Sequence, residues 1–157
     1  MIRPKRLGHV VFLVSDGARS KDFYTRILGL HVLEEDSADH GGTIFLGLRE
    51  FGNTLDLIPS TDPKAGGAHL EFRSFGGLGM HHAGFEVESH EALREAYFTL
   101  VDNKVPIIEA LDHDTTQSIY FKDPDGHVIE LYWPRPSSAR KWEEGREDEH
   151  LPLKFTR

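Results

Sequence analysis

One segment near the C-terminal end concentrates side chains that could do chemistry. From His113 to Glu130 it carries a histidine, a tyrosine at position 120 and a carboxylate, with an Asp-Pro-Asp-Gly sequence between the last two. Since Pro and Gly at this spacing favour a tight turn, we predict a hairpin between strands 118–122 and 127–133. Such a hairpin would let His113, Tyr120 and Glu130 converge on one pocket.

Two further histidines could complete a metal site with Glu130. His9 and His82 each open a strand pattern, and they coincide when the two halves of the chain are aligned. One histidine or glutamate on a strand is more often structural, but three at equivalent positions facing one cavity favour metal binding. Two imidazoles and one carboxylate, with other positions open, form the facial triad of non-haem Fe(II). We therefore predict a metalloenzyme with His9, His82 and Glu130 as ligands.

The alternation of side chains along the predicted strands supports this cavity. His82 and Gly84 share a face with Glu86, and Tyr120 and Glu130 also lie on faces that carry polar groups, whereas the opposite faces are apolar. Unpaired carboxylates and imidazoles are costly in a dry core. We expect the polar faces to line the cavity and the apolar faces to pack on a helix. The remaining histidines of turns, strand starts and the C-terminal end are expected to be solvated, among them His31, His40, His90, His127 and His150.

The order of predicted elements occurs twice. Strand, helix and three strands are predicted at 7–14, 18–28, 30–36, 43–48 and 54–59, and again at 80–87, 91–103, 106–110, 118–122 and 127–133. A duplication of this kind dictates the architecture. We predict an α+β domain over residues 1–136, in which two tandem βαβββ modules (about 5–60 and about 79–136) form a curved mixed-sheet half-barrel around the metal site.

Two segments lie outside this repeat. Residues 60–79 are rich in Gly and Pro and are predicted to be a linker loop, in which 68–72 could pair briefly. Residues 137–157 form a charged C-terminal extension, expected to have a short helix around Trp142 and no part in function, although Trp142 and Phe155 could dock on the body of the protein.

Composition excludes several classes of protein. The 157 residues carry a net charge of −8 and no basic cluster, which disfavours binding to nucleic acid or to an anionic membrane. No apolar run approaches the roughly 20 residues of a membrane span, and no signal peptide is evident. With no cysteine, any metal must be held by His, Asp and Glu. We expect a soluble cytoplasmic protein.

The chain resembles the vicinal oxygen chelate superfamily over about residues 5 to 135. The stretches Phe-Tyr-Thr-Arg-Ile-Leu-Gly-Leu (23–30) and Asp-Pro-Asp-Gly-His-Val-Ile-Glu-Leu (123–131) are typical of it. The second half also resembles the type I extradiol dioxygenases, and in particular the C-terminal domain of catechol 2,3-dioxygenase. The residues that match the motif of that family are His113, Ile119, Tyr120, Asp123, Pro124, Gly126 and Glu130. The chain departs from the motif at Leu111, where the family prefers Gly, Asn, Thr, Ile or Val.

This resemblance implies a one-domain extradiol dioxygenase that cleaves a catechol-type aromatic ring with O2. It implies Fe(II) as cofactor, held by His9, His82 and Glu130, with His113 and Tyr120 as the catalytic residues that contact substrate. Mn(II) accepts the same ligands. The resemblance further implies a homo-oligomer, dimer or higher, in which the metal site could combine residues of two chains.

Two other functions of the same fold stay open. A glyoxalase-type lyase or isomerase would use a fourth acidic ligand, and Asp56 occupies the first-half position that corresponds to Glu130. A drug-binding resistance protein would bind its ligand without metal. The dioxygenase family usually has a further acid–base histidine where this chain has Gly67, and whether His69 takes that role is also open.

Overall fold

The computed structural model describes residues 1–49, 51–62, 79–145 and 150–157. The chain divides into two compact units, residues 1–67 and 68–157. Both the possible pairing of 68–72 and His69 lie outside the described residues. In the part of the chain that is described, no helix has the length and apolarity to cross a membrane.

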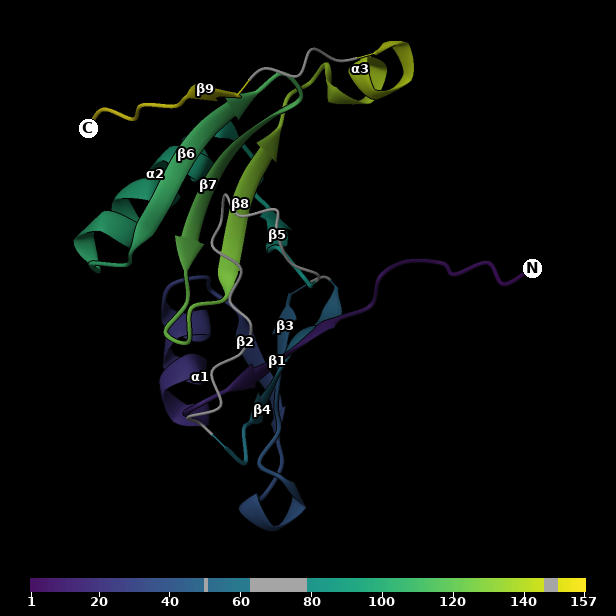
Figure 1. Cartoon of the computed structure of the whole chain (residues 1–157), viewed down its shortest axis with the longest axis vertical. Helices are drawn as coiled ribbons and strands as arrows, with labels where there is room; N and C mark the ends of the chain where they lie inside the picture. The colour runs from purple at the N-terminus through teal and green to yellow at the C-terminus, as the bar shows by residue number, and fades with distance from the viewer. Residues whose placement is uncertain (50, 63–78, 146–149) are drawn as a thin grey trace. The chain divides into compact units, whose positions relative to one another are not determined.

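The first unit is a four-stranded mixed sheet with one α-helix. Along the chain, β1 (Val10–Val14) leads into α1 (Gly17–Arg26), and three further strands follow: β2 (His31–Glu35), β3 (Ile44–Leu48) and β4 (Gly52–Pro59). The sheet order is β1-β4-β3-β2, with β1 parallel to β4 and the other pairs antiparallel (Figure 1). A short 3₁₀ turn, Ala38–His40, joins β2 to β3.

The second unit follows the same plan and adds one strand. It contains β5 (Ala83–Glu86), α2 (His90–Asp102), β6 (Ile107–His113), β7 (Thr116–Lys122), β8 (Val128–Pro134), α3 (Ser138–Glu144) and β9 (His150–Pro152). The sheet order is β5-β8-β7-β6-β9, with β5 parallel to β8 (Figure 1). The α+β class and the duplicated βαβββ order predicted from the sequence are therefore confirmed, and each unit presents an open sheet.

Each sheet has one face covered by its helix and one face that carries the polar groups. In the second unit, cross-strand pairs place Ile119 beside Leu131 and Phe121 beside Ile129, and α2 packs on β7 and β8. Ile119, Phe121 and Ile129 have no exposed surface. The opposite face carries Tyr120 paired with Glu130. The predicted assignment of these two strands to faces is correct because side chains alternate along a strand.

The structure differs from the expected elements in several places. β1 and β5 begin at Val10 and Ala83, three residues later than predicted, so that His9 and His82 lie just before their strands. β6 extends to His113, three residues beyond the predicted end, so that His113 belongs to a strand and not to a loop. β9 was not expected, and it pairs with β6. The helix-facing side of the second sheet is not wholly apolar, because Gln117 and its cross-strand partner Asp112 lie there.

The Asp-Pro-Asp-Gly turn joins β7 to β8 as predicted. Asp123 is buried, and its Oδ1 accepts hydrogen bonds from the backbone N–H groups of Asp125 (3.0 Å) and His127 (2.7 Å). Its Oδ2 lies 2.9 Å from Nδ1 of His127, which is therefore paired and not merely solvated. Gly126 has a φ of 90°, a conformation that favours glycine. This turn sets the register that places Tyr120 opposite Glu130.

Replacing Asp123 with alanine should destabilise the second unit by about 3 kcal/mol, because two backbone donors and an imidazole lose their acceptor. Asp123→Asn keeps an oxygen for both backbone donors and should lose less than half of that. Urea unfolding followed by circular dichroism measures both. Equal losses in the two variants would show that the turn does not depend on these hydrogen bonds.

Candidate functional site

Three side chains, two from strands and one from the residue before a strand, meet on the polar face of the second sheet. Glu130 of β8 lies between His82, which directly precedes β5, and Tyr120 of β7. The Tyr120 hydroxyl donates to Oε1 of Glu130 (2.7 Å), and Oε2 lies 3.2 Å from Nε2 of His82. The rings of His82 and Tyr120 pack edge to face at 5.4 Å. The structure thus brings together two predicted metal ligands and one predicted catalytic residue.

His113 extends this cluster to the next strand. Its Nε2 lies 3.2 Å from the Tyr120 hydroxyl, which gives a continuous line of contacts from His82 through Glu130 and Tyr120 to His113. All four residues come from different parts of the second half of the chain, and β5, β8, β7 and β6 lie in that order in the sheet.

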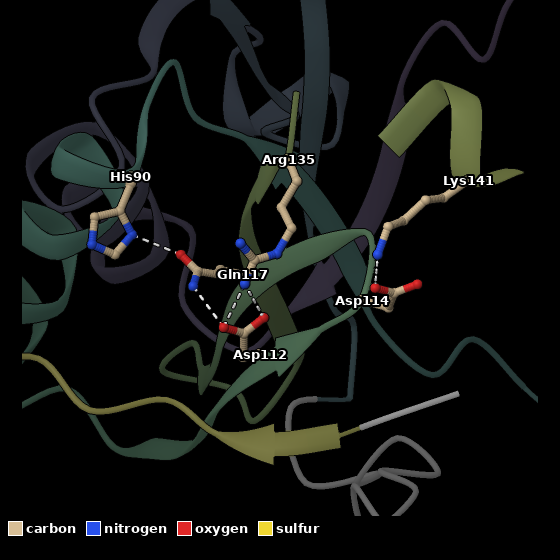
Figure 2. A network of polar contacts seen from close by, with 6 residues as sticks. All are labelled: His90, Asp112, Asp114, Gln117, Arg135 and Lys141. Carbon is tan, nitrogen blue, oxygen red and sulfur yellow. Dashed lines mark hydrogen bonds and ion pairs between the residues drawn. The ribbon is translucent and has the colours of Figure 1, made fainter. Parts of the chain in front are cut away.

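Ion pairs on either side of His113 hold the end of its strand (Figure 2). Asp112 receives both Arg135 (2.5 and 2.6 Å) and the side-chain amide of Gln117 (2.8 Å). Asp114 pairs with Lys141 of α3. Because both neighbours are anchored, the backbone at His113 is fixed, and the alternation of the strand directs His113 to the face opposite Asp112.

A histidine of α2 closes the same network. Nδ1 of His90 lies 2.6 Å from Oε1 of Gln117 (Figure 2), and the His90 ring packs against Trp133 at 5.8 Å. His90 is exposed, as expected from the sequence, and it is also hydrogen-bonded. It joins the N-terminal turn of α2 to the polar patch on the helix-facing side of the sheet.

The site favours an ionised Glu130 and a neutral Tyr120. Burial by itself would raise the pKa of Glu130, but hydrogen bonds from His82, Ser118 and Tyr120 outweigh it and lower that pKa below its ordinary value. Burial, and then the negative charge of Glu130, raise the pKa of Tyr120. Glu130 is therefore an anionic oxygen donor and Tyr120 a hydrogen-bond donor at neutral pH.

The first unit holds a second histidine–carboxylate pair at the corresponding position. Nε2 of His9, which directly precedes β1, lies 3.5 Å from Oδ2 of Asp56 in β4. Asp56 is buried, and its Oδ1 has no hydrogen-bond partner among the described residues. Both units thus present one imidazole and one carboxylate from neighbouring parallel strands, as the duplication requires.

The predicted triad draws on both units. His9 belongs to the first unit, and His82 and Glu130 belong to the second. Within the residues described, no group of three or more His, Asp or Glu side chains is gathered that could hold a metal. The pairing of His82 with Glu130 is observed, and their combination with His9 on one ion stays a prediction.

The donor atoms of each pair have a spacing that suits a metal ion. Two ligands bound at about 2.1 Å and at right angles lie about 3 Å apart. Nε2 of His82 lies 3.2 Å from Oε2 of Glu130, and Nε2 of His9 lies 3.5 Å from Oδ2 of Asp56. Because the Tyr120 hydroxyl donates to Oε1 of Glu130, Oε2 is the oxygen that would bind an ion. The chemistry of this donor set, imidazole nitrogen with carboxylate oxygen, fits Fe(II) and Mn(II).

The backbone beside Glu130 leaves little space for a larger residue. Gly84 lies opposite Glu130 in the parallel β5–β8 pair, and a Cβ atom there would lie 3.0 Å from Oε2 of Glu130. Gly84→Val should therefore displace this oxygen and weaken metal binding by about tenfold, the scale of effects from groups around a ligand. Isothermal titration with Mn(II) measures the change. Gly8→Val, where a Cβ meets no atom within 4 Å, is the control that should bind like the wild type.

Three polar residues at this face were not identified from the sequence. Nδ1 of His81 lies 2.8 Å from Nδ1 of His82, and Nδ1 of His150 lies 2.7 Å from Nδ1 of His113. The buried hydroxyl of Ser118 lies beside Glu130 and helps to lower its pKa. His81 adjoins a predicted ligand, but only coordinates show the contact. His150 is distant in the sequence, and no local pattern predicts its position.

The family model of the Glyoxalase/Bleomycin resistance protein/Dioxygenase superfamily matches residues 6–131. The chain belongs to this superfamily, which confirms the vicinal oxygen chelate resemblance. Its match covers both βαβββ modules and all five predicted site residues.

Relatives of two different activities resemble the chain. It is 31% identical over 135 residues to biphenyl-2,3-diol 1,2-dioxygenase 2 of Rhodococcus globerulus, an alignment that covers 83% of this chain and 64% of that protein. It is 32% identical over 133 residues to the metallothiol transferase FosB of Staphylococcus epidermidis, with 82% of this chain and 83% of that protein covered. The chain therefore spans less than two thirds of the length of the dioxygenase.

Solved structures confirm the fold. A glyoxalase/dioxygenase from Nostoc punctiforme has a TM-score of 0.70 at 24% identity and covers 86% of this chain and 97% of its own. At this identity the similarity establishes the shared architecture alone.

Proposed function

We propose that this protein is an extradiol dioxygenase that uses Fe(II) and O2 to cleave a catechol-type aromatic ring. The observation that carries the proposal is the line of contacts from His82 through Glu130 and Tyr120 to His113. It joins two ligands of the predicted triad to both predicted catalytic residues. The 31% identity to a biphenyl-diol dioxygenase supports the same activity.

Each residue has a role in this proposal. His9, His82 and Glu130 hold the metal, which when bound orients the two substrate oxygens and O2 and stabilises negative charge. On substrate binding, the single O–H of Tyr120 would turn from Glu130 toward a substrate oxygen, and burial keeps that proton on Tyr120. His113, whose Nε2 lies 3.2 Å from the Tyr120 hydroxyl, holds or moves a proton at Nε2, as an imidazole can near neutral pH.

A second candidate is a metal-dependent thiol transferase. The specific observation that favours it is the 32% identity to FosB over most of both chains. This activity would use the same metal ligands with a thiol as one substrate. The glyoxalase-type alternative instead depends on Asp56 as a fourth ligand beside His9. The distance of 3.5 Å between Oδ2 of Asp56 and Nε2 of His9 favours this alternative.

Parallel assays test these candidates. The protein is purified anaerobically, loaded with Fe(II) and mixed with 2,3-dihydroxybiphenyl in air-saturated buffer, and a yellow ring-cleavage product is expected. Mn(II)-loaded protein is tested with fosfomycin and a thiol, and Zn(II)- or Ni(II)-loaded protein with methylglyoxal and glutathione. Turnover in either of these without ring cleavage contradicts the dioxygenase proposal. If elemental analysis finds no stoichiometric metal in the protein after loading, the drug-binding alternative is favoured.

The cellular and assembly predictions belong to the same proposal. We propose a cytoplasmic enzyme that acts as a homo-oligomer, as the resemblance to the superfamily implies. Light scattering of the metal-loaded protein measures the oligomeric state. A monomer that binds one metal ion per chain would show that both units of a single chain supply the ligands.

A further inference from the structure

The C-terminal strand brings a histidine to the edge of the site face. β9 pairs antiparallel with β6 (Figure 1). The register of this pair sets His150 opposite His113. Residues directly opposite in a strand pair project to the same side of the sheet. Accordingly, Nδ1 of His150 lies 2.7 Å from Nδ1 of His113, with the rings edge to face at 4.7 Å.

Contacts beyond β9 hold the rest of the tail on the protein. The N–H of Leu153 donates to the carbonyl of Ala110 (2.9 Å). The Phe155 ring packs on Tyr97 of α2 at 5.0 Å, and Nε of Arg94 donates to the carbonyl of Thr156 (2.9 Å). Anchors on both β6 and α2 therefore hold the tail, so that the position of His150 is determined by the fold.

The order of donors and acceptors assigns a proton to each nitrogen. An ionised Glu130 only accepts hydrogen bonds, so Tyr120 must donate its O–H to it. The Tyr120 oxygen can then accept from His113, which requires the proton of the neutral His113 ring to be on Nε2. Its Nδ1 is left as an acceptor, and the donor that reaches it is Nδ1–H of His150.

We propose that His150 is a positioning residue of the site: it holds His113 in the tautomer that carries its proton on Nε2, facing Tyr120. The expected effect on turnover rests on the proposed function. The hydrogen bond between the two imidazole rings does not depend on it. The C-terminal extension is thus part of the site and not a surface appendage. The Tyr120 oxygen also favours Nε2–H on His113, so loss of the His150 donor removes one of two hydrogen bonds that stabilise this tautomer and raises the share of the other.

Substitutions at position 150 separate the hydrogen bond from the bulk of the ring. His150→Phe keeps a ring and removes the donor, and His150→Ala repeats the removal with a smaller side chain. His150→Asn places an amide N–H near the position of the imidazole Nδ1 and should restore the hydrogen bond to His113. Leu151→Ala is the control, since Leu151 is 56% exposed and projects from the other side of β9.

Two readouts decide the outcome. Long-range ¹H–¹⁵N spectra of the metal-free protein at about pH 8, where an ordinary imidazole is neutral, report the His113 tautomer, assigned by comparison with His113→Gln. Wild type, His150→Asn and Leu151→Ala should show a single Nε2–H form, and His150→Phe and His150→Ala should show a measurable share of the Nδ1–H form beside it. In the Fe(II)-loaded enzyme, both removals should lower kcat about tenfold with KM unchanged.

The two readouts also separate the inference from the proposed function. A single Nε2–H tautomer in His150→Phe and His150→Ala overturns the role of His150, whatever the activity. The expected tautomer change in a protein that cleaves no catechol supports the role of His150 and counts against the dioxygenase. A tautomer change with unaltered kcat in an active enzyme overturns the claim that this positioning serves catalysis.

Discussion

Glu130→Gln should reduce the affinity for Fe(II) or Mn(II) by about 100-fold or more, because groups that merely orient a ligand already contribute about 10–100-fold. The amide has no charge, and its nitrogen cannot accept the hydrogen bond that Tyr120 now donates to Oε1. Isothermal titration of the metal-free protein with Mn(II), together with elemental analysis after Fe(II) loading, measures the loss. Turnover of a catechol should fall at least in proportion.

A carboxylate on the same face of the neighbouring strand is the matched control. Glu86 of β5 is exposed and accepts a hydrogen bond from Tyr132 (3.2 Å), outside the proposed ligand set. Glu86→Gln should bind metal like the wild type. If Glu130→Gln also retained wild-type affinity, Glu130 would not be a ligand, and the metal site proposed here would be wrong.

The same variant changes how stability depends on pH in the metal-free protein. The pKa of Glu130 is lowered in the folded state, so its carboxylate stabilises the fold at pH values above the ordinary pKa of 4.5. That contribution is lost as the pH falls through the lowered folded-state pKa. Glu130→Gln should therefore show a smaller loss of stability than the wild type on acidification below about pH 4.5, measured by urea unfolding.

Tyr120→Phe should lower kcat for ring cleavage by about 100-fold, the lower end of what a positioned proton donor contributes. The ring of Tyr120 is 6% exposed, and phenylalanine fills the same space without the hydroxyl that contacts both Glu130 and His113. Metal content should change far less than in Glu130→Gln, because the carboxylate itself is retained. Steady-state kinetics with Fe(II)-loaded protein of measured metal content gives the comparison.

Tyr132→Phe is the control for removal of a hydroxyl group. Tyr132 lies on β8 two residues from Glu130, and its hydroxyl contacts Glu86. This variant should keep kcat within about twofold of the wild type, as expected for a hydroxyl group that does not take part in proton transfer. Equal losses in the two variants would mean that Tyr120 acts only by packing, and wild-type turnover in Tyr120→Phe would remove it from the proposed catalytic residues.

Much of the candidate site was predictable because it depends on short-range rules. The Asp-Pro-Asp-Gly turn determines that β7 and β8 form a hairpin, and the register then makes Tyr120 and Glu130 cross-strand partners. Alternation along β5 and β8 accounts for Gly84 beside Glu130. The duplicated pattern predicted equivalent places for His9 and His82, and each directly precedes the first strand of its unit.

Other contacts could not be predicted because long-range packing decides them. The extension was expected to be a surface segment, yet β9 adds an edge strand and places His150 on His113. Backbone groups at a sheet edge accept a strand with little regard to its sequence, so the local pattern does not indicate the partner. The polar network of Asp112, Gln117 and Arg135 on the helix side likewise joins residues that only the folded sheet brings together.

By itself the sequence determined the superfamily, the duplicated βαβββ plan and the chemical types of the candidate ligands, because periodicity, turn residues and motif spacing are local properties. Tertiary structure alone decided which atoms touch: Oε1 of Glu130 on Tyr120, Oε2 toward His82, Asp56 beside His9, and His150 on His113. Those contacts depend on strand order and on the docking of the tail. Strand order and tail docking both depend on the burial of whole sheet and helix faces, which cannot be predicted from a short segment of sequence.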